Sequence, residues 1–129
     1  MSFAVIDTDV FSFIFKKDSR ASLYTPHLRG QRRALCFMTV AEAYRWSIRR
    51  SWSSGRTQEL LDQISQYTVL PEDDEMAWHW ARVTSIKGRP IEPSDAWIAA
   101  AALRHGLPLV THNRRHFEHI SGLTVISEA

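Results

Sequence analysis

The sequence predicts a three-layer α/β/α domain built on a mainly parallel central sheet. Two observations lead to this fold class: short apolar runs alternate with longer amphipathic segments, and a length of 129 residues suits one hydrophobic core. We therefore expect residues 1–129 to form a single domain. Ligands of such sheets bind at the carboxyl ends of the strands, so a functional site is expected at that edge.

Five short apolar runs have the length and composition of buried strands. They are residues 3–6, 34–38, 68–70, 109–111 and 124–126. The first run ends directly before Asp7, which places an acid at the carboxyl end of a buried parallel strand. The second run contains Cys36 between Leu35 and Phe37, and these apolar neighbours indicate a buried thiol.

The segments between these runs predict helices. They are residues 10–15, 20–28, 39–52, 57–67, 72–87 and 96–105. Asp9 is the expected N-cap of the first helix, and Ser94 or Asp95 opens the last. Thr39 and Glu42 match a capping box, in which the Glu42 side chain accepts a hydrogen bond from the Thr39 backbone N–H.

Turn-forming residues separate these helices. Gly30, the segment 53–55 and the segment 88–93 are expected to be breaks or loops, and Gly106 ends the last helix. The acids at residues 72–75 favour the start of a helix, where negative charge complements the helix dipole. On that helix we expect Trp78, Ala81 and Ile86 to face the core. Residues 112–119 are expected to form a loop.

Composition argues against a secreted or membrane-embedded protein. The single cysteine has no internal disulfide partner, no basic segment precedes an apolar one at the N-terminus, and no apolar run approaches the ~20 residues of a membrane span. We expect a cytoplasmic protein. Residues 1–56 carry ten Lys and Arg against four acids, a net charge of +6, whereas residues 57–129 carry −4. The basic half suits a polyphosphate partner, but charge alone favours solvated helix faces as the explanation.

Four acids are expected to meet at the carboxyl edge of the sheet: Asp7, Asp9, Glu42 and Asp95. Each alone can be a helix cap or a favourable charge in a first helical turn. A cluster of carboxylates, however, raises the pKa of at least one member unless a cation neutralises it. Mg²⁺ prefers oxygen ligands and binds through carboxylates and substrate phosphates, which suits a nuclease.

Four ordered motifs carry a resemblance to a known family. They are VIDTDV at residues 5–10, TVAE at 39–42, PSDAWIAA at 93–100 and LVTHNRRHF at 109–117. With these motifs the chain resembles the PIN domain, and specifically the VapC toxins of bacterial toxin–antitoxin pairs. The resemblance implies a PIN-like fold and a metal-dependent endoribonuclease that cuts structured RNA, typically tRNA or ribosomal RNA, with Mg²⁺ or Mn²⁺. It also implies a small antitoxin of VapB type that blocks the site, and a homodimer.

The resemblance also implies roles for individual residues. Asp7, Glu42 and Asp95 match the metal-binding carboxylates, while Thr8 and Thr111 match hydroxyls that orient water or phosphate. Asp9 stands where asparagine is commoner in the family, so it either adds charge to the site or acts as a cap alone. The catalytic candidates are Asp7, Asp9, Glu42, Asp95 and Thr111.

The last motif departs further from the family pattern. Relatives usually bring another acid at the position of Asn113 or of His116, and this chain has neither acid. The sequence therefore leaves open whether one ion or two ions bind and whether the activity is weakened. Asn113 and His116 are candidate substrate contacts together with Thr8. Arg45 and Arg49 lie one helical turn apart beside Glu42, where they contact RNA phosphates or form a solvated face.

Histidines and tryptophans allow further interpretations. His112, His116 and His119 have a spacing compatible with a zinc site, but their basic neighbours favour a solvated or phosphate-contacting cluster. Tryptophan side chains can stack on bases in single-stranded nucleic acids, yet helical placement favours the core or a partner interface for all five. They are Trp46, Trp52, Trp78, Trp80 and Trp97.

Two other functions compete with the nuclease. Asp7, Thr8 and Asp9 also match the D-x-D opening of haloacid-dehalogenase-like phosphatases, whose first acid is a covalent nucleophile. That class would need a late acidic pair and a strand-end lysine, for which the sequence offers no convincing candidates. A PIN-like binding module for RNA or protein that has lost turnover is the second alternative, because of Asn113 and His116.

Overall fold

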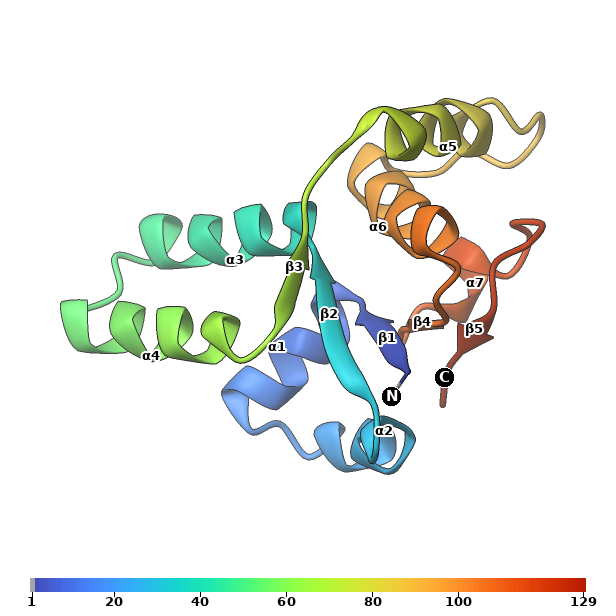
Figure 1. The fold of residues 1–129 in the computed structure, drawn as a ribbon. Helices are drawn as coiled ribbons and strands as arrows, with labels where there is room; N and C mark the ends of the chain where they lie inside the picture. Colours follow the sequence, from blue (N-terminus) through green and yellow to red (C-terminus); the bar gives the residue numbers. More distant parts are fainter. Residues whose placement is uncertain (1) are drawn as a thin grey trace.

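The computed structural model describes residues 2–129, and its centre is a five-stranded sheet in the order β3-β2-β1-β4-β5 (Figure 1). The strands are β1 (Phe3–Ile6), β2 (Arg32–Cys36), β3 (Thr68–Leu70), β4 (Leu109–Val110) and β5 (Val125–Ile126). Neighbouring strands of this sheet are parallel to each other. The predicted α/β fold with a mainly parallel sheet is therefore confirmed.

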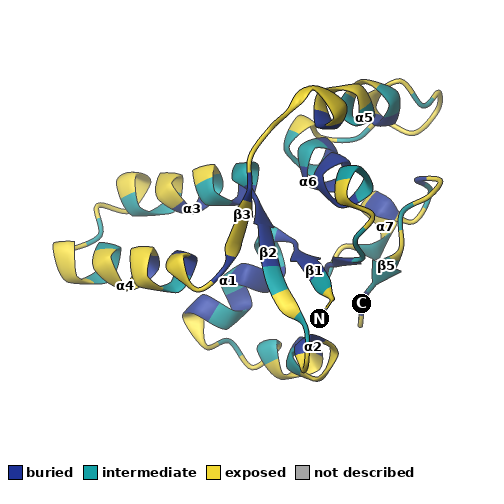
Figure 2. Ribbon diagram, viewed as in Figure 1, coloured by how far each residue is buried: buried dark blue, intermediate teal, exposed yellow. Residues whose placement is uncertain are grey.

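Helices cover both faces of the sheet. They are α1 (Thr8–Lys16), α2 (Ala21–Leu28), α3 (Phe37–Arg49), α4 (Ser54–Ser65), α5 (Asp74–Thr84), α6 (Pro93–His105) and α7 (Arg114–Phe117). Alternation along β1 shows why two layers are needed: Val5 packs into one core cluster with α5 and α6, whereas Ala4 and Ile6 pack into the other with α1, α2 and α4. Figure 2 shows buried residues of α1 and α6 beside the sheet, and α5 lying outside α6.

The order in which the chain adds strands to the sheet switches sides at β1. From β1 the chain proceeds to β2 and β3 on one side, then crosses to β4 and β5 on the other. Ile6 pairs with Val110 in the register of β1 and β4, so Asp7 and Thr111 follow neighbouring strand ends. Such a switch point leaves a crevice at the carboxyl edge, where parallel sheets bind their ligands.

Two expected helix caps are wrong, and both errors concern the site. Asp7, not Asp9, caps α1, because its Oδ1 accepts a hydrogen bond of 2.7 Å from the Thr8 backbone N–H. Helix α3 begins directly after β2, at Phe37, and Cys36 caps it by accepting from the Met38 backbone N–H at 3.5 Å. The capping box of Thr39 and Glu42 therefore does not form.

The predicted inner face of α5 is also wrong. Trp78 is 62% exposed and Ala81 is exposed, whereas Met76 and Val83 are buried and Ile86 lies half-buried beyond the end of the helix. The Asp73 side chain caps α5 by accepting from the Met76 backbone N–H at 2.8 Å, which sets the start of the helix. From that start, the buried positions are seven residues apart and the other face meets solvent.

Several boundaries differ from those predicted. Helix α4 begins at Ser54 because Ser53 caps it, so the expected break contains its first turn. Helix α6 begins one residue before Ser94, since Pro93 suits a first helical position. The expected loop over 112–119 contains the short helix α7. Strand β2 starts and ends two residues earlier than expected, and β4 and β5 are each one residue shorter; the bounds of β1 and β3 are confirmed.

Most of the tryptophans pack against the core, as expected. Trp46 and Trp52 pack against the cluster of α1, and Trp80 stacks on Trp97 at 5.3 Å between ring centroids beside the cluster of α6. Trp78 is the exception. Cys36 is fully buried, in agreement with the sequence. No helix within residues 2–129 is both long enough and apolar enough to cross a membrane.

Candidate active site

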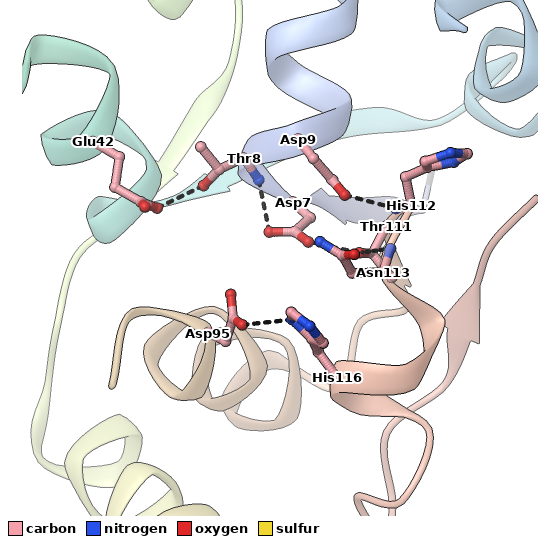
Figure 3. Close-up of polar contacts among 9 residues, drawn as sticks. All are labelled: Asp7, Thr8, Asp9, Glu42, Asp95, Thr111, His112, Asn113 and His116. Atoms are coloured by element: carbon pink, nitrogen blue, oxygen red, sulfur yellow. Dashed lines mark hydrogen bonds and ion pairs between the residues drawn. The ribbon is translucent and has the colours of Figure 1, made fainter. Parts of the chain in front are cut away.

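Four carboxylates face one another at the switch point of the sheet, and we call this group the acidic pocket (Figure 3). Asp7 follows β1, Asp9 lies in the first turn of α1, Glu42 lies in α3 and Asp95 lies in the first turn of α6. Helices from both layers thus bring acids to one strand end. Among residues 2–129, none of the four is in an ion pair with lysine or arginine.

Asp7 is held most tightly of the four. Its side chain is buried, and Oδ2 accepts a hydrogen bond of 2.6 Å from the Thr111 hydroxyl while Oδ1 accepts from the Thr8 N–H. Burial raises the pKa of Asp7 well above its ordinary value, and the negative charge of Asp9 raises it further. The two hydrogen bonds lower this pKa but do not cancel the rise. Asp7 is therefore a fixed acceptor whose negative charge is poorly compensated.

Glu42 is fixed through two hydroxyl groups. Thr8 Oγ1 donates to Glu42 Oε1 at 2.8 Å, and Thr8 Oγ1 also lies 2.8 Å from Thr39 Oγ1. Because the Thr8 hydroxyl has one proton and donates it to Glu42, the Thr39 hydroxyl donates to Thr8. Burial raises the pKa of Glu42, and the charge of Asp95 raises it further. The chain Thr39–Thr8–Glu42 thus orients one oxygen of the carboxylate.

Asp9 is engaged on both oxygens. Oδ1 accepts from the Val10 backbone N–H at 2.6 Å, and Oδ2 accepts from the His112 backbone N–H at 3.1 Å. Burial raises the pKa of Asp9, although these two bonds oppose the rise. The contact with His112 ties the first turn of α1 to the segment after β4. Asp9 therefore has a structural role that does not need a ligand.

Asp95 forms the opposite wall of the acidic pocket. It is partly buried, and His116 Nδ1 lies 2.9 Å from its Oδ2 (Figure 3). Burial raises the pKa of Asp95, whereas the hydrogen bond from His116 lowers it. The charge of Asp95 also raises the pKa of both Asp7 and Glu42, so Asp95 is close enough to repel each of these carboxylates.

The donor set suits a hard divalent cation. The acids of the pocket, which follow β1 or lie on α1, α3 and α6, offer carboxylate oxygens, the ligand type of Mg²⁺ and Mn²⁺. Across residues 2–129, no three His, Cys, Asp or Glu side chains converge closely enough to bind one ion directly. The residues therefore fit an ion that one or two carboxylates bind and that keeps several waters, which is the usual mode of Mg²⁺.

The other predicted site residues differ in how they are connected to the acids. Thr111 is fully buried, and its hydroxyl accepts from the Asn113 backbone N–H at 3.0 Å, so Asn113 adjoins the pocket through Thr111. Arg45 is exposed on α3, and its charge lowers the pKa of Glu42. Arg49 is exposed one turn farther along α3, and no contact among the described residues links it to the acids.

The three histidines have different surroundings. His112 Nδ1 is hydrogen-bonded to the Tyr24 hydroxyl, and His116 contacts Asp95. Both ring nitrogens of His119 are buried and have no hydrogen-bond partner among the described residues.

Thr39 is the site residue that sequence reasoning missed, since it was assigned to a cap. It is fully buried and contacts Thr8. A signal was present in the sequence: Thr39 precedes Glu42 by three residues, so both lie on one face of a helix. With Glu42 directed into the site, Thr39 had to point the same way.

Comparison with known proteins agrees with this geometry. The sequence matches the PIN domain family over residues 4–123. Ribonuclease VapC1 of Haemophilus influenzae (strain R2866) is 29% identical over an alignment of 126 residues, and the match covers 92% of each chain. Ribonuclease VapC5 of Mycobacterium tuberculosis is 32% identical over 84% of this chain and 82% of its own. The tRNA(fMet)-specific endonuclease VapC of Salmonella typhimurium is 28% identical over 94% of each chain.

Two solved structures with the same fold are VapBC complexes bound to DNA. In DNA-bound VapBC from Salmonella typhimurium, the matching chain is 27% identical with a TM-score of 0.77 over 98% of each chain. In VapBC2 from Rickettsia felis bound to a promoter fragment, the TM-score is 0.84 at 17% identity, over 98% of this chain and 99% of the other, which is a likeness of fold. The matched family and these relatives lead to one conclusion: the chain belongs to the PIN-domain family, among its VapC-type ribonucleases.

Proposed function

We propose that the protein is a metal-dependent endoribonuclease and the toxin of a VapBC-type pair, hydrolysing phosphodiester bonds in structured RNA. One observation carries the proposal: at the switch point, the charge of Asp95 raises the pKa of both Asp7 and Glu42, and none of these three carboxylates forms an ion pair with lysine or arginine within residues 2–129. Leaving such charge uncompensated costs free energy that a bound divalent cation would recover.

The chain's own residues divide the work in this proposal. Among Asp7, Glu42 and Asp95, one or two carboxylates would bind Mg²⁺ or Mn²⁺ directly and the rest through water. Thr8 and Thr111 keep the carboxylate oxygens in place through the bonds described above. The ion, when bound, would lower the pKa of a water and offset the charge on the phosphate. Arg45 at the rim of the pocket would hold an RNA phosphate beside Glu42.

The substrate and partner follow from the relatives by analogy. The Salmonella relative is named for cleavage of tRNA(fMet), which supports tRNA, or another structured RNA such as ribosomal RNA, as the substrate class. Two solved relatives were crystallised as VapBC complexes, which supports a small VapB-type antitoxin that blocks the acidic pocket. We extend the proposal to a homodimer in the cytoplasm and to a single domain over residues 1–129.

A binding module without turnover is the second candidate. The contact between His116 and Asp95 favours it, because an imidazole occupies one oxygen of a proposed metal ligand. The phosphatase interpretation is set aside, since the chain belongs to the PIN family.

Cleavage of a total tRNA pool by the purified protein, with Mg²⁺ or Mn²⁺ and with EDTA, tests the proposal. We expect cleavage only with metal, and a loss of about 10²–10³-fold in rate for Asp7→Asn, since the charge that holds the ion is removed. Glu72→Gln is the matched control, because Glu72 is an exposed acid away from the pocket. RNA ends identical in wild type and Asp95→Asn, at equal rates, would refute catalysis by this site.

A further inference from the structure

A second cavity lies against the acidic pocket and shares Asp95 with it. It has a volume of about 500 Å³ and is lined by residues 89–92, Asp95, Arg115, His116 and His119. Residues 89–92 form the loop that leads into α6, while the other lining residues come from α6, α7 and the turn after α7. A volume of this size lies within the range of small-ligand sites. We call it the side cavity.

The side cavity offers two unpaired guanidinium groups. Arg89 and Arg115 line it from opposite segments, and neither forms an ion pair with a carboxylate among the described residues. Arginine presents a planar fork of N–H donors that matches phosphate oxygens. The only acids on the wall are Glu92 and Asp95. Asp95 is already turned to the acidic pocket and to His116, so the arginines are left for an outside anion.

The remaining wall suits a flat ring with polar edges. Pro90 and Ile91 supply apolar surface, and the imidazole of His119 lines the same space. Both nitrogens of that imidazole are buried without a partner, although a neutral ring always has one donor and one acceptor. A nucleobase has an apolar face that matches this wall, and its edge carries the donors and acceptors that the His119 nitrogens would meet after a turn of the ring.

We propose that the side cavity is a nucleotide subsite: it receives the nucleotide adjoining the scissile phosphate, with its phosphate on Arg89 and Arg115 and its base against Pro90, Ile91 and His119. This inference rests on the proposed ribonuclease function and deepens it, because it assigns substrate selection to residues outside the acidic pocket. Asp95 connects the two spaces, so a nucleotide in the side cavity places the next phosphate beside the proposed metal ligands.

The test measures the binding of mononucleotides to the full chain in EDTA, with NMR or calorimetry as the readout. The probes are 5′-AMP, 5′-CMP, ribose 5-phosphate and inorganic phosphate. We expect the two nucleotides to bind more tightly than either of the base-free probes. Arg89→Ala and Arg115→Ala should each weaken nucleotide binding about tenfold, as expected for a lost charged hydrogen bond. Both arginines are exposed, so the variants are expected to fold.

Arg32→Ala is the matched control, because Arg32 lines a cavity of similar size, about 490 Å³, at the start of β2 and away from the acids. It should leave nucleotide binding unchanged.

Three outcomes would overturn the inference. They are equal affinity for phosphate and nucleotides, nucleotide binding that Arg89→Ala and Arg115→Ala do not weaken, and binding of an acidic peptide but no nucleotide. The RNA-cleavage assay separates this from the main proposal. Cleavage by wild type with unaltered nucleotide binding in the variants refutes the subsite alone, whereas nucleotide binding without any RNA cleavage refutes the nuclease.

Discussion

In two regions of the molecule, the pKa values of aspartates are shifted in opposite directions. In the acidic pocket, burial raises the pKa of Asp7, and neighbouring acids raise it further. Two aspartates on the surface show the reverse. A hydrogen bond from Arg20 lowers the pKa of Asp18. The pKa of Asp73 is lowered by the hydrogen bond that it accepts from the Met76 backbone N–H and by Arg104. The difference lies first in burial and then in charge: the surface acids are solvent-accessible and paired with arginine, whereas the pocket acids are buried or half-buried beside one another, with no lysine or arginine ion pair among the described residues.

This comparison indicates what the pocket acids are for. A cap or a surface ion pair stabilises the fold with its carboxylate charged, as Asp73 does at the start of α5. Three carboxylates in one crevice oppose folding when charged. Such an arrangement is retained for binding, and a divalent cation is the simplest ligand that removes the repulsion. Each of the following experiments compares a pocket residue with a matched residue outside it.

The largest effect should come from adding metal to metal-free protein. A ligand at one hundred times its Kd stabilises the folded state by about 2.7 kcal/mol, which for a chain of this size raises the Tm by roughly 10 °C. We expect this shift with Mn²⁺ in wild type and in Asp73→Asn, and little or no shift in Asp7→Asn. Differential scanning calorimetry checks it. Similar shifts in wild type and Asp7→Asn would place the ion elsewhere.

The pH dependence of stability should have opposite signs in the two regions. The folded-state pKa of Asp7 lies above its unfolded value, so between the two values the folded state binds more protons. The free energy of unfolding of metal-free protein should therefore fall as pH rises through that window. For Asp73 the folded pKa is lowered, so its contribution is present above the unfolded pKa and is lost as pH falls.

Urea unfolding of the metal-free protein from about pH 2 to 8 measures both signs. Relative to wild type, Asp7→Asn should lose the gain in stability on acidification, whereas Asp73→Asn should lose some stability near neutral pH. The comparison between the two regions breaks down if both variants change the pH profile in the same direction.

A smaller effect is expected from the hydroxyl chain that orients Glu42. Thr39→Val removes the donor to Thr8 while keeping the shape of the side chain, and a lost hydrogen bond of about 1 kcal/mol corresponds to about a fivefold decrease in kcat/KM for RNA cleavage. Thr39→Ser keeps the hydroxyl and should retain most activity. Equal losses in the two variants would mean that packing, and not the hydrogen bond, matters at this position.

The smallest effect should separate the two arginines of α3. Arg45 lies close enough to Glu42 to lower its pKa, whereas Arg49 has no contact with the pocket among the described residues. Arg45→Ala should raise KM for RNA about two- to threefold and flatten the salt dependence of binding, because one phosphate contact is lost. Arg49→Ala should change neither. An identical salt slope for wild type and Arg45→Ala would remove Arg45 from the RNA surface.

Much of the fold was predictable because its signals are local. The apolar run 3–6 followed by Asp7 predicted β1 with correct bounds, and the alternation of short strands with helices predicted the parallel sheet. Cap assignments failed where two polar residues compete for one role. Asp7 and Asp9 both precede apolar helical residues, and only the position of the strand end decides that Asp7 caps α1. On α5, the cap at Asp73 set the buried face, which periodicity had placed wrongly.

The sequence by itself determined which acids follow strands and begin helices, since these are properties of neighbouring residues: Asp7 after an apolar run and Asp95 in a first helical turn. That Asp7, Glu42 and Asp95 bind metal stays a prediction. Only the tertiary structure decided which side chains meet. The contacts of Thr8 with Glu42 and of His116 with Asp95 join residues 34 and 21 positions apart. The parallel pairing of β1 with β2 brings the first pair together, and the packing of α6 beside the segment after β4 brings the second pair together. Such pairings depend on strand order, which residue types and local spacing leave open.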